Sequence, residues 1–289
     1  MKNKKIRVGI IFGGKSAEHE VSLQSAKNVI DALDKNKYEP VLIGIDKKGK
    51  WYLQDKSNFL INSSNPKLIS LNKSTRLVAA IPEQQENSLV VLSTQKGGID
   101  VVLPILHGPF GEDGTIQGML KLMDIPFVGS GVLGSAIGMD KEITKRLLRD
   151  SGIPIAEFIT VNNVNDVTFE QAKKKLGLPL FIKPANMGSS VGVSKANNQK
   201  EFDTAIKLAF KYDRKVLVEQ AIIGREIECS VLGNENPIAS IPGEIVVKAN
   251  FYSYEAKYID ENGATLEIPA KLSKALTKKI QLMAIATFK

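Results

Sequence analysis

Apolar runs alternate with amphipathic stretches along the first part of the chain. Residues 7–12 and 38–45 are β-rich apolar runs, and we expect both to form buried strands. Between them, apolar residues recur at helical spacing and predict an amphipathic helix over 20–33. These residues are Val21, Ala26, Val29, Ile30 and Leu33. A strand, a helix and a second strand in this order predict a βαβ unit and a parallel sheet.

The pattern of apolar and polar residues is harder to interpret between residues 46 and 98, and it again predicts distinct elements from about residue 100. The elements expected here are a strand at 89–92, a strand at 100–106, a helix ending at 123 and a short strand at 127–128. The strand at 100–106 enters a polar loop over 107–114. Together these elements predict a first α/β domain, which we place at residues 1–134.

The second half of the chain alternates helices and strands after a glycine-rich joint over 129–134. The elements expected are helices near 139–149, 168–176 and 199–211, strands at 180–182 and 215–219, and short antiparallel strands over 226–247. Residues 248–263 show no period and predict a long loop. We place two further domains at residues 135–224 and 225–289.

A lysine-rich helix is expected from residue 272 to the last residue. Its apolar residues are Ile280, Met283, Ala284, Ala286 and Phe288. This face needs a partner, because a helix in a globular protein buries its apolar side. No later strand in the sequence supplies one.

Composition is that of an ordinary soluble globular protein. The 289 residues are 43% hydrophobic and 24% charged, which excludes a disordered chain, and the length suggests about two domains. The formal net charge of +8 raises the question of nucleic acid binding. The lysines are scattered, however, and aromatic residues are only 6%, so we expect no nucleic acid partner.

Counts of single residue types exclude further classes of protein and of metal site. A single cysteine, Cys229, leaves no disulfide framework, and with only two histidines a zinc site of the usual ligands is not expected. No apolar run approaches the ~20 residues of a membrane span. The apolar stretch after the basic start is too short for a signal peptide. We therefore expect a cytoplasmic protein with no membrane partner.

Residues 9–16 match the Walker A pattern of phosphate-binding loops. Such a loop needs an open backbone whose N–H groups face phosphates, but Ile10, Ile11 and Phe12 are typical of a strand. We therefore favour a strand that ends in a turn at residues 13–14. This turn would lie at the carboxyl edge of the sheet, where open α/β sheets bind ligands.

Two polar segments follow strands of this predicted sheet. Glu18, His19 and Glu20 follow the first strand, and His107 follows the strand at 100–106. A lone histidine is more often structural than functional. Two polar loops at one sheet edge nevertheless favour a shared ligand crevice.

The stretch from Phe181 to Val193 is the most informative of the chain. A strand delivers Lys183 at its end, and a Gly-Ser-Ser-x-Gly turn follows over residues 188–192. A lysine supplies a point charge for phosphate, and glycines and serines let N–H groups and hydroxyls close over it. A plain hairpin stays an alternative, since both residue types are common in turns.

Two glutamates follow the next strand. Glu219 ends the apolar run at 215–219, and Glu226 follows a Gly-Arg turn. An acceptor after a strand suits an adenine amino group, and a second acid suits ribose hydroxyls. Both are equally typical of surface carboxylates, and spacing alone does not choose.

Taken together, these stretches resemble the D-alanine–D-alanine ligases, members of the ATP-grasp superfamily. The motifs that carry the resemblance are Gly13 to Ser22, Leu106 to Gly118, Gly138 to Lys141, Lys183 to Gly192 and Tyr254 to Tyr258. The likeness extends from about Arg7 to the last residue. It implies an α/β fold with an N-terminal parallel-sheet domain, Rossmann-like and of the pre-ATP-grasp kind, followed by an ATP-grasp α+β unit.

The resemblance also implies a reaction, used in peptidoglycan synthesis and so in cell wall biogenesis and cell shape. ATP would phosphorylate the carboxylate of one D-alanine, and the amine of a second would displace the phosphate. Glu18 would engage the first ammonium group, with Val21 and His107 beside it. Ser189, Glu18 and Tyr258 would form the catalytic group that closes the mobile loop, and Tyr258 argues for D-alanine as acceptor. The family further implies a homodimer.

The resemblance assigns a larger set of residues to ATP. They are Lys141, Lys183, Ser189, Ser190, Glu219, Gln220, Ala221, Glu226 and Lys257. Lys141 and Lys183 would hold phosphates under the two serines, and Lys257 would reach the γ-phosphate. Adenine would lie against Glu219 and the backbone after it, and Glu226 would hold the ribose.

One departure from the family concerns the metal. The family places its Mg2+ (or Mn2+) ligands, and an arginine for the transition state, after the final helix seen here. No Asp or Glu follows Glu267, so no metal ligand is assigned in this chain, and the expected ones would lie beyond Lys289. The ATP-grasp unit is therefore expected to be incomplete, and the chain alone to be marginally stable with little ligase activity.

Three alternatives stay open at this point. The first is another ATP-grasp carboxylate–amine ligase that uses a different amine. The second is an inactive, truncated ATP-grasp remnant that binds nucleotide without turnover. The third is a P-loop NTPase built on the Walker A match.

Overall fold

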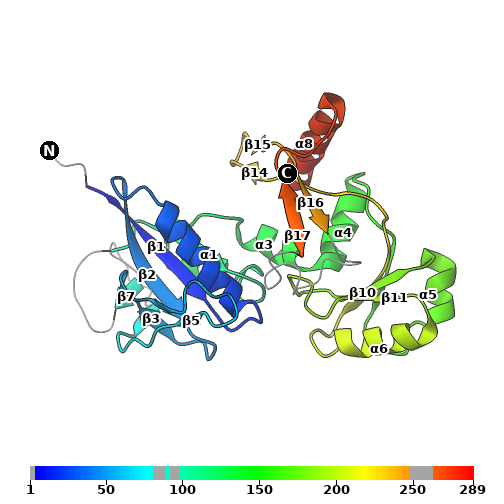
Figure 1. Ribbon diagram of the computed structural model, residues 1–289, viewed down its shortest axis with the longest axis horizontal. Coiled ribbons are helices and arrows are strands. Elements are labelled where there is room, and N and C mark those ends of the chain that lie inside the picture. The colour runs from blue at the N-terminus through cyan, green and yellow to red at the C-terminus, as the bar shows by residue number, and fades with distance from the viewer. Residues whose placement is uncertain (1–3, 81–88, 92–97, 248–262) are drawn as a thin grey trace. The chain divides into compact units, whose positions relative to one another are not determined.

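The structure is a computed structural model that describes residues 4–80, 89–91, 98–247 and 263–289. The chain forms two compact units (Figure 1). Unit 1 comprises Met1–Asp140 with Asn186–Gly188, and unit 2 comprises Lys141–Ala185 with Ser189–Lys289. Each unit has a hydrophobic core of its own. The domain boundaries expected at residues 134 and 224 stay predictions.

A four-stranded sheet forms the centre of unit 1, in the order β3-β2-β1-β8. Its strands are β1 (Ile6–Gly13), β2 (Tyr38–Ile45), β3 (Trp51–Leu53) and β8 (Val101–Leu106). β1 runs parallel to β2 and β8, and helix α1 (His19–Ala32) connects β1 to β2. The predicted βαβ unit and parallel sheet are therefore confirmed. β3 adds one antiparallel edge strand.

Alternate side chains of β1 enter two cores, one on each face of the sheet. Ile10 and Phe12 are fully buried in the cluster that includes α1. Ile11 is fully buried in the other cluster, with Ile116 of helix α2 (Thr115–Leu122). A central parallel strand covered on both faces has no polar side, which explains its continuous apolar run.

The smaller elements of unit 1 follow the expectations only in part. They are β4 (Leu60–Ile61), β5 (Ser70–Leu71), β6 (Val78–Ala80), β7 (Leu89–Val91) and α3 (Val132–Met139). β7 confirms the strand expected over 89–92, but it pairs with β6 outside the main sheet. The short strand expected at 127–128 is only a single bridge from Phe127 to Val102.

Helix α3 corrects the glycine-rich joint expected over 129–134. The helix includes part of that segment, and a separate helix, α4 (Lys141–Asp150), follows it. Met139 therefore ends one helix rather than starting the next. Gly134 lies within this helix, where a Cβ would come within 2.4 Å of the hydroxyl oxygen of Ser130.

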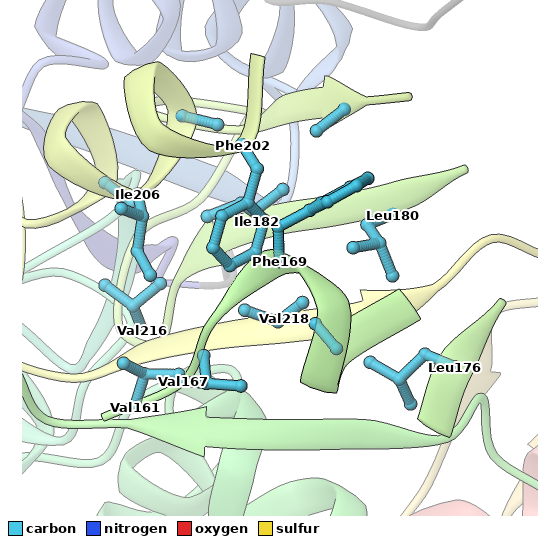
Figure 2. Close-up of a cluster of buried hydrophobic side chains, with 14 residues drawn as sticks. Val161, Val167, Phe169, Leu176, Leu180, Ile182, Phe202, Ile206, Val216 and Val218 are labelled. Atoms are coloured by element: carbon cyan, nitrogen blue, oxygen red, sulfur yellow. The ribbon is translucent and has the colours of Figure 1, made fainter. Parts of the chain in front are cut away.

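Unit 2 contains a four-stranded antiparallel sheet in the order β11-β10-β12-β9. Its strands are β9 (Phe158–Val161), β10 (Leu180–Pro184), β11 (Ser194–Ala196) and β12 (Val216–Gln220). Helices α5 (Phe169–Leu176) and α6 (Gln199–Ala209) pack on this sheet, with Phe169 and Phe202 inside the shared core (Figure 2). The predicted helices and strands of this region are confirmed.

The remainder of unit 2 is a second sheet, a hairpin and the last helix. They are β13 (Glu226–Glu228), β14 (Val231–Leu232), β15 (Ile238–Ala239), β16 (Gly243–Val247), β17 (Ala264–Glu267) and α8 (Lys274–Phe288). β16 lies between β13 and β17, as expected for antiparallel strands. α8 contacts the β14–β15 hairpin, yet none of its own residues is buried. Leu282 and Phe288 are about half exposed.

Candidate active site

Two lysines flank one carboxylate in unit 2. Lys183 on β10 has its Nζ 2.8 Å from Oε1 of Glu219, and Lys145 on α4 has its Nζ 2.8 Å from Oε2. All three side chains are less than a fifth exposed. The sheet register pairs Lys183 with Leu217, so Lys183 and Glu219 are diagonal neighbours on one face. The register of β10 and β12 therefore creates the pair.

A third lysine lies at the end of the same strand. The backbone N–H of Lys141 donates to the carbonyl oxygen of Ala185 at 3.0 Å, and its Nζ lies 3.2 Å from that oxygen. Ala185 directly follows β10, so Lys141 is held close to the end that carries Lys183. Two ammonium groups on one carboxylate, with a third lysine at the end of the same strand, favour an anionic ligand such as phosphate.

Lys145 is a site residue that the sequence analysis missed. Its spacing was the available signal, because residues four apart, such as Lys141 and Lys145, lie on one helix face. The Nζ of Lys145 also donates to the carbonyl of Ala156 at 3.2 Å and lies 5.6 Å from the ring centre of Phe158. These contacts hold its ammonium group in one place.

A second ion-pair group ties α4 to the start of β12. Oε2 of Glu142 lies 2.9 Å from Nζ of Lys215, and Oε1 lies 3.0 Å from Arg146. The hydrogen bond from Lys215 lowers the pKa of Glu142, against a smaller opposing effect of burial and with help from Arg146. The carbonyl of Lys215 in turn accepts from the N–H of Ala185 at 2.9 Å. These bonds keep α4 and the end of β10 together.

The serine loop after β10 has a constrained backbone. Ser189 and Ser190 have φ of 47° and 62°, in the left-handed region that non-glycine residues rarely adopt. Gly192 is required, because a Cβ there would approach Tyr212 and Pro184 to 2.7 and 2.8 Å. β10 and β11 pair as a hairpin, so the hairpin and the phosphate-loop interpretations describe one segment. Backbone strain of this kind gathers at ligand sites.

A groove of about 550 Å³ is lined by strands of both sheets of unit 2. Ala221 and Glu226 line it, whereas Glu219 and Gln220 do not. The carboxylate of Glu219 instead faces the lysines, so its role toward adenine stays a prediction. The backbone N–H of Gln220 donates to the carbonyl of Glu157 at 2.9 Å.

The crevice predicted in unit 1 lies where β1 and β8 end. The register pairs Gly13 with Leu106, so the two following loops begin side by side. The hydroxyl of Ser16 donates to the carbonyl of His107 at 2.7 Å, which joins the loops. Nε2 of His107 lies 3.1 Å from the hydroxyl of Ser25 on α1. The structure therefore holds the histidine at this crevice.

The other predicted substrate residues lie at the start of α1. Glu18 and Val21 are buried, with 3% and 5% of their surface exposed. His19 is also buried, and its Nδ1 lies 2.7 Å from the carbonyl oxygen of Gly14. The histidine ring therefore packs against the turn that follows β1. Glu20 pairs with Lys47. The roles of Glu18 and Val21 toward a substrate stay predictions.

The Walker A match is a strand and not a phosphate-binding loop. Ile10, Ile11 and Phe12 have no exposed surface, and residues 9–12 pair with β2 and β8 on both sides. Their N–H groups therefore belong to the sheet and cannot cradle a phosphate. The P-loop NTPase alternative is wrong.

The remaining predicted residues concern the mobile loop and the metal. Lys257 and Tyr258 lie outside the described residues. Within the described ranges, no group of three or more His, Cys, Asp or Glu side chains is arranged to hold a metal ion.

Known proteins with similar sequences and structures agree on one family. The family model described as D-ala D-ala ligase N-terminus matches residues 7–130, and the one described as D-ala D-ala ligase C-terminus matches residues 147–289. A D-alanine–D-alanine ligase of Oceanobacillus iheyensis is 57% identical over 289 residues, covering 99% of this chain and 79% of the relative. D-alanine–D-alanine ligase A of Escherichia coli K12 is 53% identical with the same coverage.

Two solved structures extend the likeness to the fold. The VanG D-Ala:D-Ser ligase of Enterococcus faecalis matches with a TM-score of 0.81 and 34% identity, over 99% of this chain and 82% of that one. The D-alanine–D-alanine ligase of Coxiella burnetii matches with a TM-score of 0.81 and 35% identity, over 98% and 76%. On sequence and fold alike, the chain belongs to the D-alanine–D-alanine ligase family.

Proposed function

We propose that this protein uses ATP to join two D-alanine molecules into D-alanyl-D-alanine for peptidoglycan synthesis. The observation that carries the proposal is the pair Lys145 and Lys183 on the carboxylate of Glu219, with Lys141 held on the carbonyl of Ala185 directly after β10. It supplies the positive charge that a triphosphate needs, in a chain whose similar relatives are named for this reaction. The ATP-grasp fold of the family supports the same conclusion.

The reaction depends on positioning and charge neutralisation more than on covalent chemistry by the protein. A carboxylate oxygen of the first D-alanine attacks the γ-phosphorus, and the bond to the bridging oxygen of ADP breaks. The amine of the second D-alanine then attacks the acyl carbon, loses a proton, and phosphate leaves. Lys141 and Lys183 hold the phosphates, Ser189 and Ser190 lie over them, and Lys257 reaches the γ-phosphate. Mg2+ or Mn2+ is the expected companion of ATP, and no step is assigned to it.

The first D-alanine is proposed to bind in the crevice of unit 1. Glu18 suits the ammonium group of the first D-alanine, because a buried carboxylate is stabilised by an opposite charge. Val21 and His107 are proposed to contact the same substrate, and Ser189 and Tyr258 are proposed to act in catalysis with Glu18. Adenine takes the backbone after Glu219, and Glu226 takes the ribose.

D-serine is the second candidate for the attacking amine. One relative of the same fold is named a D-Ala:D-Ser ligase. The relatives of higher identity are named for D-alanine, which supports D-alanine as the preferred acceptor. The reaction is proposed to take place in the cytoplasm, and the enzyme to act as a homodimer. Among the helices in the described part of the chain, none is long and apolar enough to cross a membrane.

Product analysis of the whole chain tests the proposal. Incubation with ATP, magnesium and D-alanine should give D-alanyl-D-alanine and ADP in equal amounts, with less product when D-serine replaces the acceptor. ATP binding without ADP would contradict the proposal and favour the inactive remnant. Product with another amine alone would favour the different-acceptor ligase.

A lysine substitution tests the phosphate site separately. Lys183→Ala should weaken ATP binding at least tenfold, since hydrogen bonds to charged groups contribute about 1.5–3 kcal/mol. The exposed Lys174→Ala on α5 is the matched control and should bind ATP as the wild type does. Isothermal titration calorimetry measures both, and equal affinities would remove Lys183 from the site.

A further inference from the structure

A second pocket, of about 160 Å³, lies in unit 1 and shares only His107 with the residues proposed to bind substrate. Most of its wall is apolar. The apolar side chains on this wall include Ile45, Trp51, Leu106, Ile116 and Met119. Neither Glu18 nor Val21 lines it. It therefore offers an apolar space apart from the carboxylate proposed for D-alanine.

The size of the pocket sets the size of a ligand. An apolar cavity of about 150 Å³ lined by Leu, Ile and Phe side chains binds benzene. This pocket has nearly the same volume, and apolar side chains form part of its wall, with the ring of Phe110 half exposed along it. A single six-membered ring, or a branched aliphatic group of that size, fits the space.

One cation lies on the wall of this pocket. The Nζ of Lys15 is 5.4 Å from the ring centre of Phe110, and both residues line the pocket. Within the described ranges Lys15 has no ion pair. Its aliphatic stem lies against Gly49, where a Cβ would come within 2.9 Å of it. A side chain larger than that of glycine at position 49 would therefore collide with the side chain of Lys15.

We propose that this pocket binds a small carboxylate whose apolar body is about one ring in size. The ring occupies the apolar space, and the carboxylate pairs with the ammonium group of Lys15. This proposal is independent of the proposed function, because the residues that support it are those that line this pocket. Ser16 and His107 also line the pocket, so a test must separate it from the substrate crevice.

The chain carries its own reporter for this test. Trp51 is the only tryptophan and lies in the wall, so its emission responds to an occupant. Benzoate is the charged probe and toluene the neutral one, each added to the whole chain without ATP. Both should change the emission saturably. Lys15→Met and Lys15→Gln should each weaken benzoate binding by about two- to fivefold, the range of an exposed ion pair, and leave toluene binding unchanged.

The same fluorescence titration includes a control variant. Lys121→Met removes an exposed lysine of α2 that does not line the pocket, and it should leave both probes unaffected. Absence of a saturable change, or benzoate binding that ignores both Lys15 substitutions, overturns the proposal. Competitive displacement of benzoate by D-alanine also overturns it, because the pocket would then be part of the substrate site. Unchanged benzoate affinity in saturating D-alanine supports a separate site.

Discussion

The carboxylate of Glu219 keeps two lysines from repelling each other. Lys145 and Lys183 approach it from different elements, and all three groups are largely removed from solvent. The charge of Glu219 therefore has a structural effect that does not depend on any nucleotide. If Glu219 were neutral, the two ammonium groups would repel each other in a poorly hydrated site. This repulsion costs more free energy there than it would at the surface.

Glu219→Gln is expected to lower the free energy of unfolding by about 1–3 kcal/mol, the cost of leaving a charged partner unsatisfied. Chemical denaturation without nucleotide measures it. The matched control, Glu170→Gln, removes a more exposed pair with Lys173 whose Nζ–Oε2 distance is 3.6 Å. The control should change stability by less than about 0.5 kcal/mol. Equal effects of the two substitutions would refute a special role for Glu219.

Glu142 makes stability depend on pH. Lys215 and Arg146 lower its pKa from the ordinary 4.5, so the folded state binds the proton less tightly than the unfolded chain does. The stabilisation is thus complete above pH 4.5 and is lost as the pH falls through the lower pKa of the folded state. The stability difference between wild type and Glu142→Gln should shrink from about pH 6 to about pH 3. A difference that stays constant in denaturant titrations would contradict this linkage.

Elements with a strong local pattern were predictable, and those that depend on distant contacts were not. The apolar run of β1 and the helical spacing of α1 carry their own signal, so both were found. Gly134 is typical of a joint because glycine disfavours helices, yet it lies inside α3. Lys183 is predictable from its loop, whereas for Lys145 the only local signal is its four-residue spacing from Lys141. No local pattern shows that Lys145 meets Glu219 of the distant strand β12.

Helix α5 offers a test of local stabilisation. The side chain of Thr168 accepts from the N–H of Gln171, and the Gln171 side chain accepts in return from the N–H of Thr168. Thr168→Ala is expected to cost about 1 kcal/mol, the usual value of a helix cap. Thr204→Ala, within α6 and exposed, is the matched control and should stay within about 0.5 kcal/mol. Urea unfolding compares the two, and equal losses would argue against the capping box.

At the scale of the whole molecule, the two units have separate cores, and the main residues proposed for nucleotide and for amino acid lie in different units. The lysine group belongs to unit 2, and the crevice of β1 and β8 belongs to unit 1. A ligand stabilises the state that it binds, by an amount set by its concentration and affinity. Nucleotide should therefore act first on the unit that holds the lysines.

Hydrogen exchange can locate that effect. ATP at about 100 times its Kd contributes about 2.7 kcal/mol to the state it binds. We expect slower amide exchange in α4, β10 and β12, with β2 unchanged. The Lys183→Ala variant, if it binds ATP tenfold more weakly, should keep only about 1.4 kcal/mol of this stabilisation at the same ATP concentration. Protection confined to unit 1 would place the nucleotide elsewhere.

The parallel pairing of β1 has a consequence for the chain as it leaves the ribosome. β1 is made early and can pair with β2 soon afterwards, but Val8 cannot pair with Val101 until β8 has been synthesised. At roughly 5–20 residues per second, this leaves the second edge of an apolar strand open for about 5–20 s. Open strand edges of this kind recruit other chains. The nascent protein is therefore most exposed to misassembly before β8 emerges, and this is the interval in which a chaperone would be of most use to it.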